Sequence, residues 1–133
     1  MPSMADLSVK TADGTTDVVY NALAPSSGDR TAAQFRQEAA SAVAANRPTF
    51  TVSSKASANG KARIVEYAFA FPATYTDSTT GLVSVLASVK ASGSFIFSKD
   101  IPDVVLSEAA AQLANVLSST LIQATLKSGY APS

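Results

Sequence analysis

Residues 49–71 read TFTVSSKASANGKARIVEYAFAF, which is two runs of strand-forming residues joined by a turn that contains Asn59-Gly60. This pattern predicts a β-hairpin. The length of the turn matters because a slip of one residue moves every side chain of a strand to the other face of the sheet. A two-residue loop would place Arg63 opposite Ala56, on the same face as Phe50.

The three-residue loop Ala58-Asn59-Gly60 instead pairs Lys55 with Arg63 and separates polar from apolar side chains, so we predict this loop. One face of the hairpin then carries hydroxyl and cationic side chains, namely Thr49, Thr51, Ser53, Lys55, Lys61 and Arg63. The opposite face carries the apolar side chains of Phe50, Val52, Ala62, Ile64 and Ala68. We therefore expect a sheet with one apolar side and one polar, cationic side.

The composition bounds the possible functions. The chain has 133 residues, enough for one domain with a modest core, and many of its apolar residues are alanine. It has no cysteine and no histidine, which excludes disulfides and thiolate chemistry and removes the usual general base. No apolar run approaches the ~20 residues needed to cross a bilayer, and the N-terminus lacks a signal-peptide pattern. We expect a soluble protein that acts without secretion and buries apolar surface against another copy of itself.

The formal net charge is zero, but the charges are unevenly distributed. Six basic and two acidic side chains lie in residues 47–99, whereas residues 1–46 and the segment from residue 100 each hold an excess of two acidic groups. The positive charge thus falls in the expected sheet, although ordinary solubilising charges would explain the distribution equally well.

Three other parts of the chain have clear patterns. Leu7–Thr11 and Asp17–Leu23 alternate around an Asp-Gly turn, which predicts a second hairpin. Val83–Ser98 alternates apolar with mostly small polar residues, which predicts a long, half-buried strand. From Pro102 the apolar residues recur at helical spacing, and Ser118-Ser119-Thr120 divides them into two predicted helices.

Residues Thr31–Ala45 are ambiguous. Their alanine content favours a helix by propensity. Gln34, Arg36 and Glu38, however, alternate with less polar neighbours in a way that a strand would also allow.

The sequence does not favour catalysis. An active site needs a poised acid, base, nucleophile or metal, and here the acidic residues are scattered without metal-ligand spacing. Asp100 and Asp103 are three residues apart, but we interpret them as charges at the start of a helix. We predict no catalytic residues, no metal site, no cofactor and no small-molecule substrate.

Nucleic-acid binding has better support. If Lys90 and Ser92 share the polar side of the hairpin, the sheet offers cations for phosphates and hydroxyls for sugars or bases. Tyr67 would fall on that side and could stack on an unpaired base, although packing beside Phe69 would explain it equally well. Glu66 would point inward unless a bulge interrupts the strand.

The order of these elements resembles that of the coat proteins of single-stranded RNA bacteriophages. The similar features are the N-terminal hairpin, a meander of strands, the loop TDSTTG (76–81), a long strand ending in FIFSKDIP (95–102), two C-terminal helices and a terminal SGY (128–130). The similarity covers nearly the whole chain and rests on order, length and spacing.

The resemblance implies an α+β fold in a single coat-protein domain over residues 1–133. An N-terminal β-hairpin (about 7–23) and an antiparallel β-sheet (about 33–98) would precede two C-terminal α-helices (about 103–128). It also implies that the ambiguous segment contains a strand. Two protomers would form an intertwined homodimer with a continuous sheet, and the helices of each would cross over its partner.

The resemblance also implies a function. Dimers of such a coat protein would assemble into an icosahedral capsid in the cytoplasm of the bacterial host, and the virion would enclose single-stranded genomic RNA against the inner sheet face. A dimer would also grip an RNA hairpin at the replicase start and repress its translation.

Carried over residue by residue, the RNA-binding positions correspond to Thr49, Thr51, Ser53, Lys61, Arg63, Val65 and Tyr67 on the hairpin and to Lys90 and Ser92 on the long strand, and Lys55 joins them from the predicted polar side. An aromatic residue that the family uses for base stacking corresponds to Lys90, and a lysine of the family corresponds to Val65. These departures weaken the expectation of hairpin specificity and leave general phosphate binding.

A second interpretation is a non-viral α+β module that binds a small ligand or a peptide on the same face. It predicts a small, RNA-free species, whereas the coat-protein interpretation predicts large particles.

Overall fold

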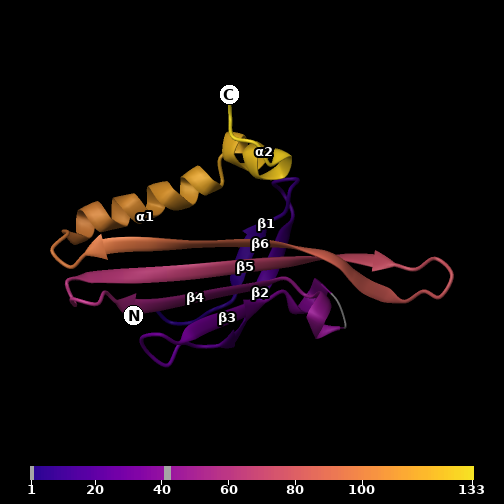
Figure 1. The fold of residues 1–133 in the computed structure, drawn as a ribbon, viewed down its shortest axis with the longest axis horizontal. Coiled ribbons are helices and arrows are strands. Elements are labelled where there is room, and N and C mark those ends of the chain that lie inside the picture. Colours follow the sequence, from indigo (N-terminus) through magenta and orange to yellow (C-terminus); the bar gives the residue numbers. More distant parts are fainter. Residues whose placement is uncertain (1, 41–42) are drawn as a thin grey trace. The chain divides into compact units, whose positions relative to one another are not determined.

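The computed structural model describes residues 2–40 and 43–133. The chain forms two compact units, residues 1–96 and residues 97–133. The first unit holds the sheet except for the last two residues of its final strand, and the second holds the C-terminal helices (Figure 1). The description of residues 1–133 as a single domain stays a prediction.

Six strands form one antiparallel sheet in which the strand order follows the chain order. The strands are β1 (Leu7–Lys10), β2 (Asp17–Ala24), β3 (Ala32–Arg36), β4 (Thr49–Ala56), β5 (Ala62–Thr76) and β6 (Val83–Ser98). Both predicted hairpins and the long predicted strand are therefore confirmed. Figure 1 shows β1 and β2 running across the direction of the longer strands.

Asp13 organises the turn between β1 and β2. Its carboxylate accepts hydrogen bonds from the Thr11 hydroxyl at 2.7 Å and from the backbone N–H groups of Thr15 and Thr16, both at 2.9 Å. These hydrogen bonds, of which the one from the Thr11 hydroxyl has the largest effect, hold the pKa of Asp13 well below its ordinary value. Gly14 has a φ of 75°, a left-handed conformation that glycine adopts without strain. The Asp-Gly signal in the sequence therefore has a direct structural cause.

The ambiguous segment begins with a strand. β3 pairs along its length with β4, and two short 3-10 turns follow it, η1 (Glu38–Ala40) and η2 (Ala44–Asn46). The α-helix favoured by propensity is wrong for these residues, because strand pairing on both sides of β3 outweighs propensity differences of roughly 0.7 kcal/mol or less per residue. Residues 41 and 42 lie outside the described part of the chain.

One side of β3, β4 and β5 is apolar. The cross-strand register places Phe35 beside Phe50 and Phe50 beside Phe69. We call this side the apolar face; its larger side chains are Phe35, Phe50, Val52, Val65, Tyr67 and Phe69. Phe35 is only 8% exposed, which makes it part of the small core.

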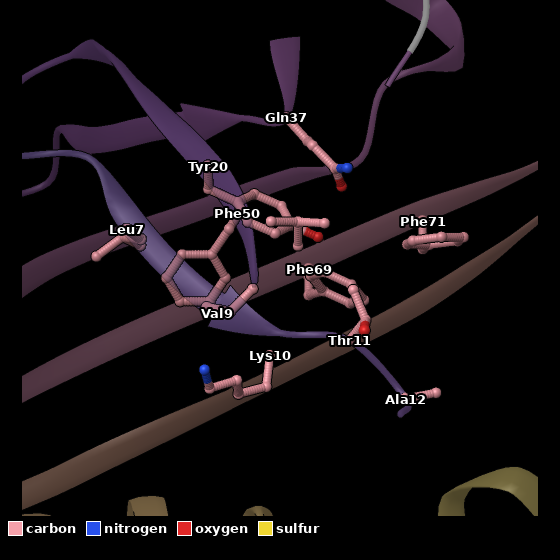
Figure 2. Close-up of a pocket in the computed structure, with 11 residues that line it drawn as sticks. Leu7, Val9, Lys10, Thr11, Ala12, Tyr20, Gln37, Phe50, Phe69 and Phe71 are labelled. Atoms are coloured by element: carbon pink, nitrogen blue, oxygen red, sulfur yellow. The ribbon is translucent and has the colours of Figure 1, made fainter. Parts of the chain in front are cut away.

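The N-terminal hairpin lies against the apolar face and leaves a hollow of about 660 Å³ between them. Figure 2 shows Leu7 and Val9 of β1 together with Phe50 and Phe69 of the longer strands among the side chains that line this hollow. Tyr20 of β2, which is 7% exposed, meets Phe69 with a ring-centroid distance of 6.4 Å, and its burial raises the pKa of its phenol.

The second unit contains α1 (Asp103–Leu117) and α2 (Thr120–Ser128), as the sequence predicts. The helices are separated at Ser118-Ser119, where the Ser119 hydroxyl donates a hydrogen bond to the Val116 carbonyl at 2.7 Å. α2 ends at Gly129, whose φ of 80° forms a left-handed cap. Within the described residues no single helix has the length and apolar character to cross a membrane, and α1 and α2 pass that test only as a pair bent by 53°.

Candidate nucleic-acid interface

The turn of the long hairpin fixes the register of β4 and β5. The Ser57 N–H donates to the Ala62 carbonyl at 2.9 Å, and the Gly60 N–H donates to the Ser57 carbonyl at 2.9 Å. The Ser57 hydroxyl bonds to Asn59 Oδ1 at 2.7 Å, and the Lys61 N–H donates to the same oxygen at 3.0 Å. The pair Ser57 and Ala62 therefore closes a four-residue loop.

This register differs by one residue from the predicted one. Arg63 pairs with Ala56, and Lys55 pairs with Ile64. The predicted pairing of Lys55 with Arg63 is therefore wrong, because hydrogen bonds from the turn side chains stabilise a loop with an even number of residues. The side chains of the hairpin therefore face as the two-residue loop would place them, with Arg63 on the same side of the sheet as Phe50.

The side of the sheet opposite the apolar face carries most of the expected binding residues. β4 places Thr49, Thr51, Ser53 and Lys55 there, as predicted. Gln34 and Arg36 join them from β3, because they pair with Thr51 and Thr49. We call this side the polar face; its polar side chains are Gln34, Arg36, Thr49, Thr51, Ser53, Lys55, Glu66, Lys90, Ser92 and Ser94.

β6 supplies the last of these side chains. Lys90 and Ser92 line an open hollow of about 290 Å³ together with Thr49 and Thr51 of β4. A neighbouring hollow of about 480 Å³ lies between Ser53 and Glu66 on one side and Ser92 and Ser94 on the other. Lys90 and Ser92 therefore share the polar side of the hairpin, which is the condition on which the expected binding surface depends. Ala68 of β5 lines both hollows, and its side chain is small.

Four of the expected binding residues lie elsewhere. Val65 pairs with Ser54 and Tyr67 pairs with Val52, which places Val65, Tyr67 and Arg63 on the side of the apolar face. Lys61 lies in the turn, outside the strands. The prediction that Arg63 and Tyr67 lie on the polar side is therefore wrong, and the structure gives a base-contacting role of these residues no geometric support.

Tyr67 packs within the sheet. Its ring stacks on Phe50 with a centroid distance of 6.4 Å and an interplanar angle of 28°. A Cβ atom placed on Gly93 of β6 would lie 2.3 Å from the Tyr67 hydroxyl oxygen, so the phenol covers the glycine backbone. The packing explanation for Tyr67 thus fits the structure, and the absence of a side chain at Gly93 makes it possible.

Two ion pairs occupy opposite sides of the hairpin. On the polar face, Lys55 Nζ lies 2.8 Å from Glu66 Oε1, with side chains 37% and 46% exposed, a pair that contributes roughly 0–1 kcal/mol. On the other side, Arg63 Nη1 and Nη2 donate to both carboxylate oxygens of Asp29 at 3.0 and 2.8 Å. The hydrogen bond that Arg63 donates to Asp29 raises the pKa of Arg63, whose guanidinium is thus held by the connection between β2 and β3.

Sequence reasoning missed three members of the polar face: Gln34, Arg36 and Glu66. The alternation of Gln34 and Arg36 with less polar neighbours was the available signal for the first two, and the helix propensity of the segment obscured it. Glu66 was expected to point inward, and the corrected register places it on the polar face without a bulge.

The polar face offers hydrogen bonding and electrostatic attraction. Within residues 2–40 and 43–133, no three His, Cys, Asp or Glu side chains gather in a way that could hold a metal ion. The face combines hydroxyl groups with the cations Arg36, Lys55 and Lys90 and with the acid Glu66. Such a set suits an extended anionic ligand that presents both phosphates and hydrogen-bonding groups.

A six-stranded antiparallel sheet followed by two C-terminal helices is the fold of levivirus-like coat proteins, and comparison with solved structures confirms that this chain has that fold. The virus-like particle of Beihai levi-like virus 21 matches with a TM-score of 0.80 and 15% identity, covering 99% of both chains. The virus-like particle of bacteriophage NT-214 matches with the same TM-score, identity and coverage. The capsid protein of bacteriophage GA matches with a TM-score of 0.73 and 14% identity, covering 96% of this chain and 95% of that chain.

No protein-family model matches the chain, and no curated protein sequence matches it significantly. The similarity is therefore one of structure over the whole length, at sequence identities of 14–15% for these three neighbours.

Proposed function

We propose that the chain is the structural coat protein of a single-stranded RNA phage, with homodimers as the building blocks of an icosahedral shell and no enzymatic activity. The observation that carries this proposal is the coat-protein fold itself, which extends over 99% of the chain when compared with one virus-like particle. Neighbours with this fold are described as virus-like particles or capsids.

The proposed ligand of the polar face is genomic RNA. Cations from three different strands lie there, Arg36 on β3, Lys55 on β4 and Lys90 on β6, which suits a flexible polyanion better than a compact ligand. Hydroxyl groups of β4 and β6 lie between them and can bond to sugars, phosphates or base edges. Ribose 2′-hydroxyls offer both a donor and an acceptor to these groups.

Homodimer formation is supported by surfaces that one chain leaves uncovered. β6 is the last strand of the sheet and has β5 as its neighbour, so its outer edge can pair with another strand. In the helices, Val104, Leu121 and Leu126 are 81%, 61% and 71% exposed. A partner that extends the sheet at β6 and receives these apolar side chains would form the intertwined dimer with a continuous sheet.

Repression of replicase translation through an RNA hairpin is a narrower proposal. It requires that a dimer select one hairpin among other RNAs, and Lys90 stands where a stacking aromatic residue occurs in the family. Assembly would take place in the bacterial cytoplasm, and the mature location would be the virion.

The experiment that tests the proposal is electron microscopy of the purified protein, combined with absorbance at 260 and 280 nm. Closed shells of uniform size that contain nuclease-protected RNA are the expected result. A monomeric or small RNA-free species at every concentration would contradict the proposal and favour a non-viral binding module.

A further inference from the structure

Two arginines share one glutamate where β3 ends and β4 begins. Arg36 Nε donates to Glu38 Oε1 at 2.7 Å, and Arg47 Nη1 donates to Glu38 Oε2. The side chains of Arg36 and Arg47 are 27% and 17% exposed. With two guanidinium groups and one carboxylate, this cluster keeps a formal charge of +1.

Arg36 belongs to the polar face through its position in the sheet. It pairs with Thr49 of β4, which in turn pairs with Ala70 of β5. Its Nε is engaged by Glu38, and among the described residues its two terminal amino groups have no hydrogen-bond partner. The guanidinium is thus held in one orientation by its inner nitrogen, while its outer donors stay available.

The position of Arg36 complements that of Lys90. Thr49 is the cross-strand partner of Arg36, and Ala70 is the cross-strand partner of Thr49. Thr49 and Ala70 line the same hollow as Lys90. β3 and β6 are separated by three strand spacings, which amounts to about 14 Å across the sheet. An RNA strand lying over the hollow would therefore meet a cation on each side.

We propose that Arg36 is a phosphate-binding residue of the polar face and that it extends the RNA-binding surface onto β3. This inference rests on the proposed RNA-binding function. It assigns to the Arg36–Glu38–Arg47 cluster a role in addition to joining β3 to the start of β4. It also distinguishes Arg36 from Arg63, whose terminal nitrogens are both engaged by Asp29.

The test is RNA affinity as a function of salt concentration. The full-length protein, freed of RNA by nuclease and high salt, is titrated against a fluorescent single-stranded RNA between 50 and 200 mM salt. The variants are Arg36→Gln, Arg36→Lys as the charge-preserving form, and Arg63→Gln as the matched control for loss of an arginine. Circular dichroism verifies that each variant is folded.

One lost phosphate contact reduces the slope of log affinity against log salt by about 0.7. Between 50 and 200 mM salt, the fold-loss of RNA affinity should therefore be about 2.6 times smaller for Arg36→Gln than for the wild type. Arg36→Lys and Arg63→Gln should keep the wild-type slope.

A wild-type slope in Arg36→Gln, with clear RNA binding by the wild type, would overturn the role of Arg36 and leave the proposed function standing. A wild-type protein that does not bind RNA under any of these conditions would overturn both.

Discussion

Gly93→Ala tests whether Tyr67 packs inside the sheet. The added Cβ would lie 2.3 Å from Tyr67 Oη and 2.5 Å from Cζ. An ordinary carbon contact needs about 3.5–4.0 Å, so the ring would have to move by more than about 1 Å. That movement disturbs its stacking on Phe50, at a centroid distance of 6.4 Å.

The expected cost follows from these contacts. Overpacking typically costs about 1–3 kcal/mol, and weakening an aromatic pair costs about 0.5–1.5 kcal/mol. Alanine in place of glycine would by itself stabilise a strand by roughly 0.5–1 kcal/mol. We therefore expect Gly93→Ala to lower the free energy of unfolding by about 1–3 kcal/mol.

The assay is urea unfolding followed by circular dichroism at fixed protein concentration, because the stability of an oligomer depends on concentration. Ser94→Ala, on the polar face of the same strand, is the control and should cost little. In a Tyr67→Val background the alanine at position 93 should be tolerated, since the ring atoms that it meets are gone. An equal cost in both backgrounds would refute the packing of Tyr67 over Gly93.

Three further predictions concern the N-terminal turn, the polar face and the helices. Asp13→Asn should lower the thermal stability of the protein at neutral pH. Because the pKa of Asp13 is lower in the folded than in the unfolded protein, the stability difference between wild type and variant should shrink as the pH falls below about 4. A difference in thermal unfolding that stays constant down to pH 2 would contradict this. Glu66→Gln should release Lys55 to bind phosphates and steepen the slope of log RNA affinity against log salt by up to about 0.7. An unchanged or shallower slope would argue against RNA binding on the polar face. Leu113→Asp should abolish dimers because it places an unpaired charge in an apolar layer. The measurement is analytical ultracentrifugation at micromolar concentration, with Gln112→Asp as the control. Normal assembly of the Leu113 variant would show that α1 does not bind the partner there.

Much of the fold could be predicted because local chemistry determines it. The Asp13 turn is stabilised by its own neighbours, and the strand alternation of β6 follows directly from the sequence. The α1–α2 division follows from the serines that interrupt the apolar spacing. In these places local preference and tertiary structure agree.

The register of the long hairpin could not be predicted, because it depends on one residue of loop length. Asn59-Gly60 signals a turn in either register, and the choice between them comes from the hydrogen bonds made by the Ser57 and Asn59 side chains. Because the predicted register was off by one residue, Arg63 and Tyr67 were predicted on the wrong face of the sheet. β3 was obscured for a different reason: its alanines favour a helix, and only the ladders with β2 and β4 make it a strand.

The central claim, that the polar face binds RNA inside a shell, is tested most directly by ultraviolet cross-linking within purified particles followed by peptide mass spectrometry. We predict cross-links in residues 34–36, 49–55 and 90–94. Cross-links confined to the N-terminal hairpin or to α1 and α2, with none in these three segments, would contradict the claim.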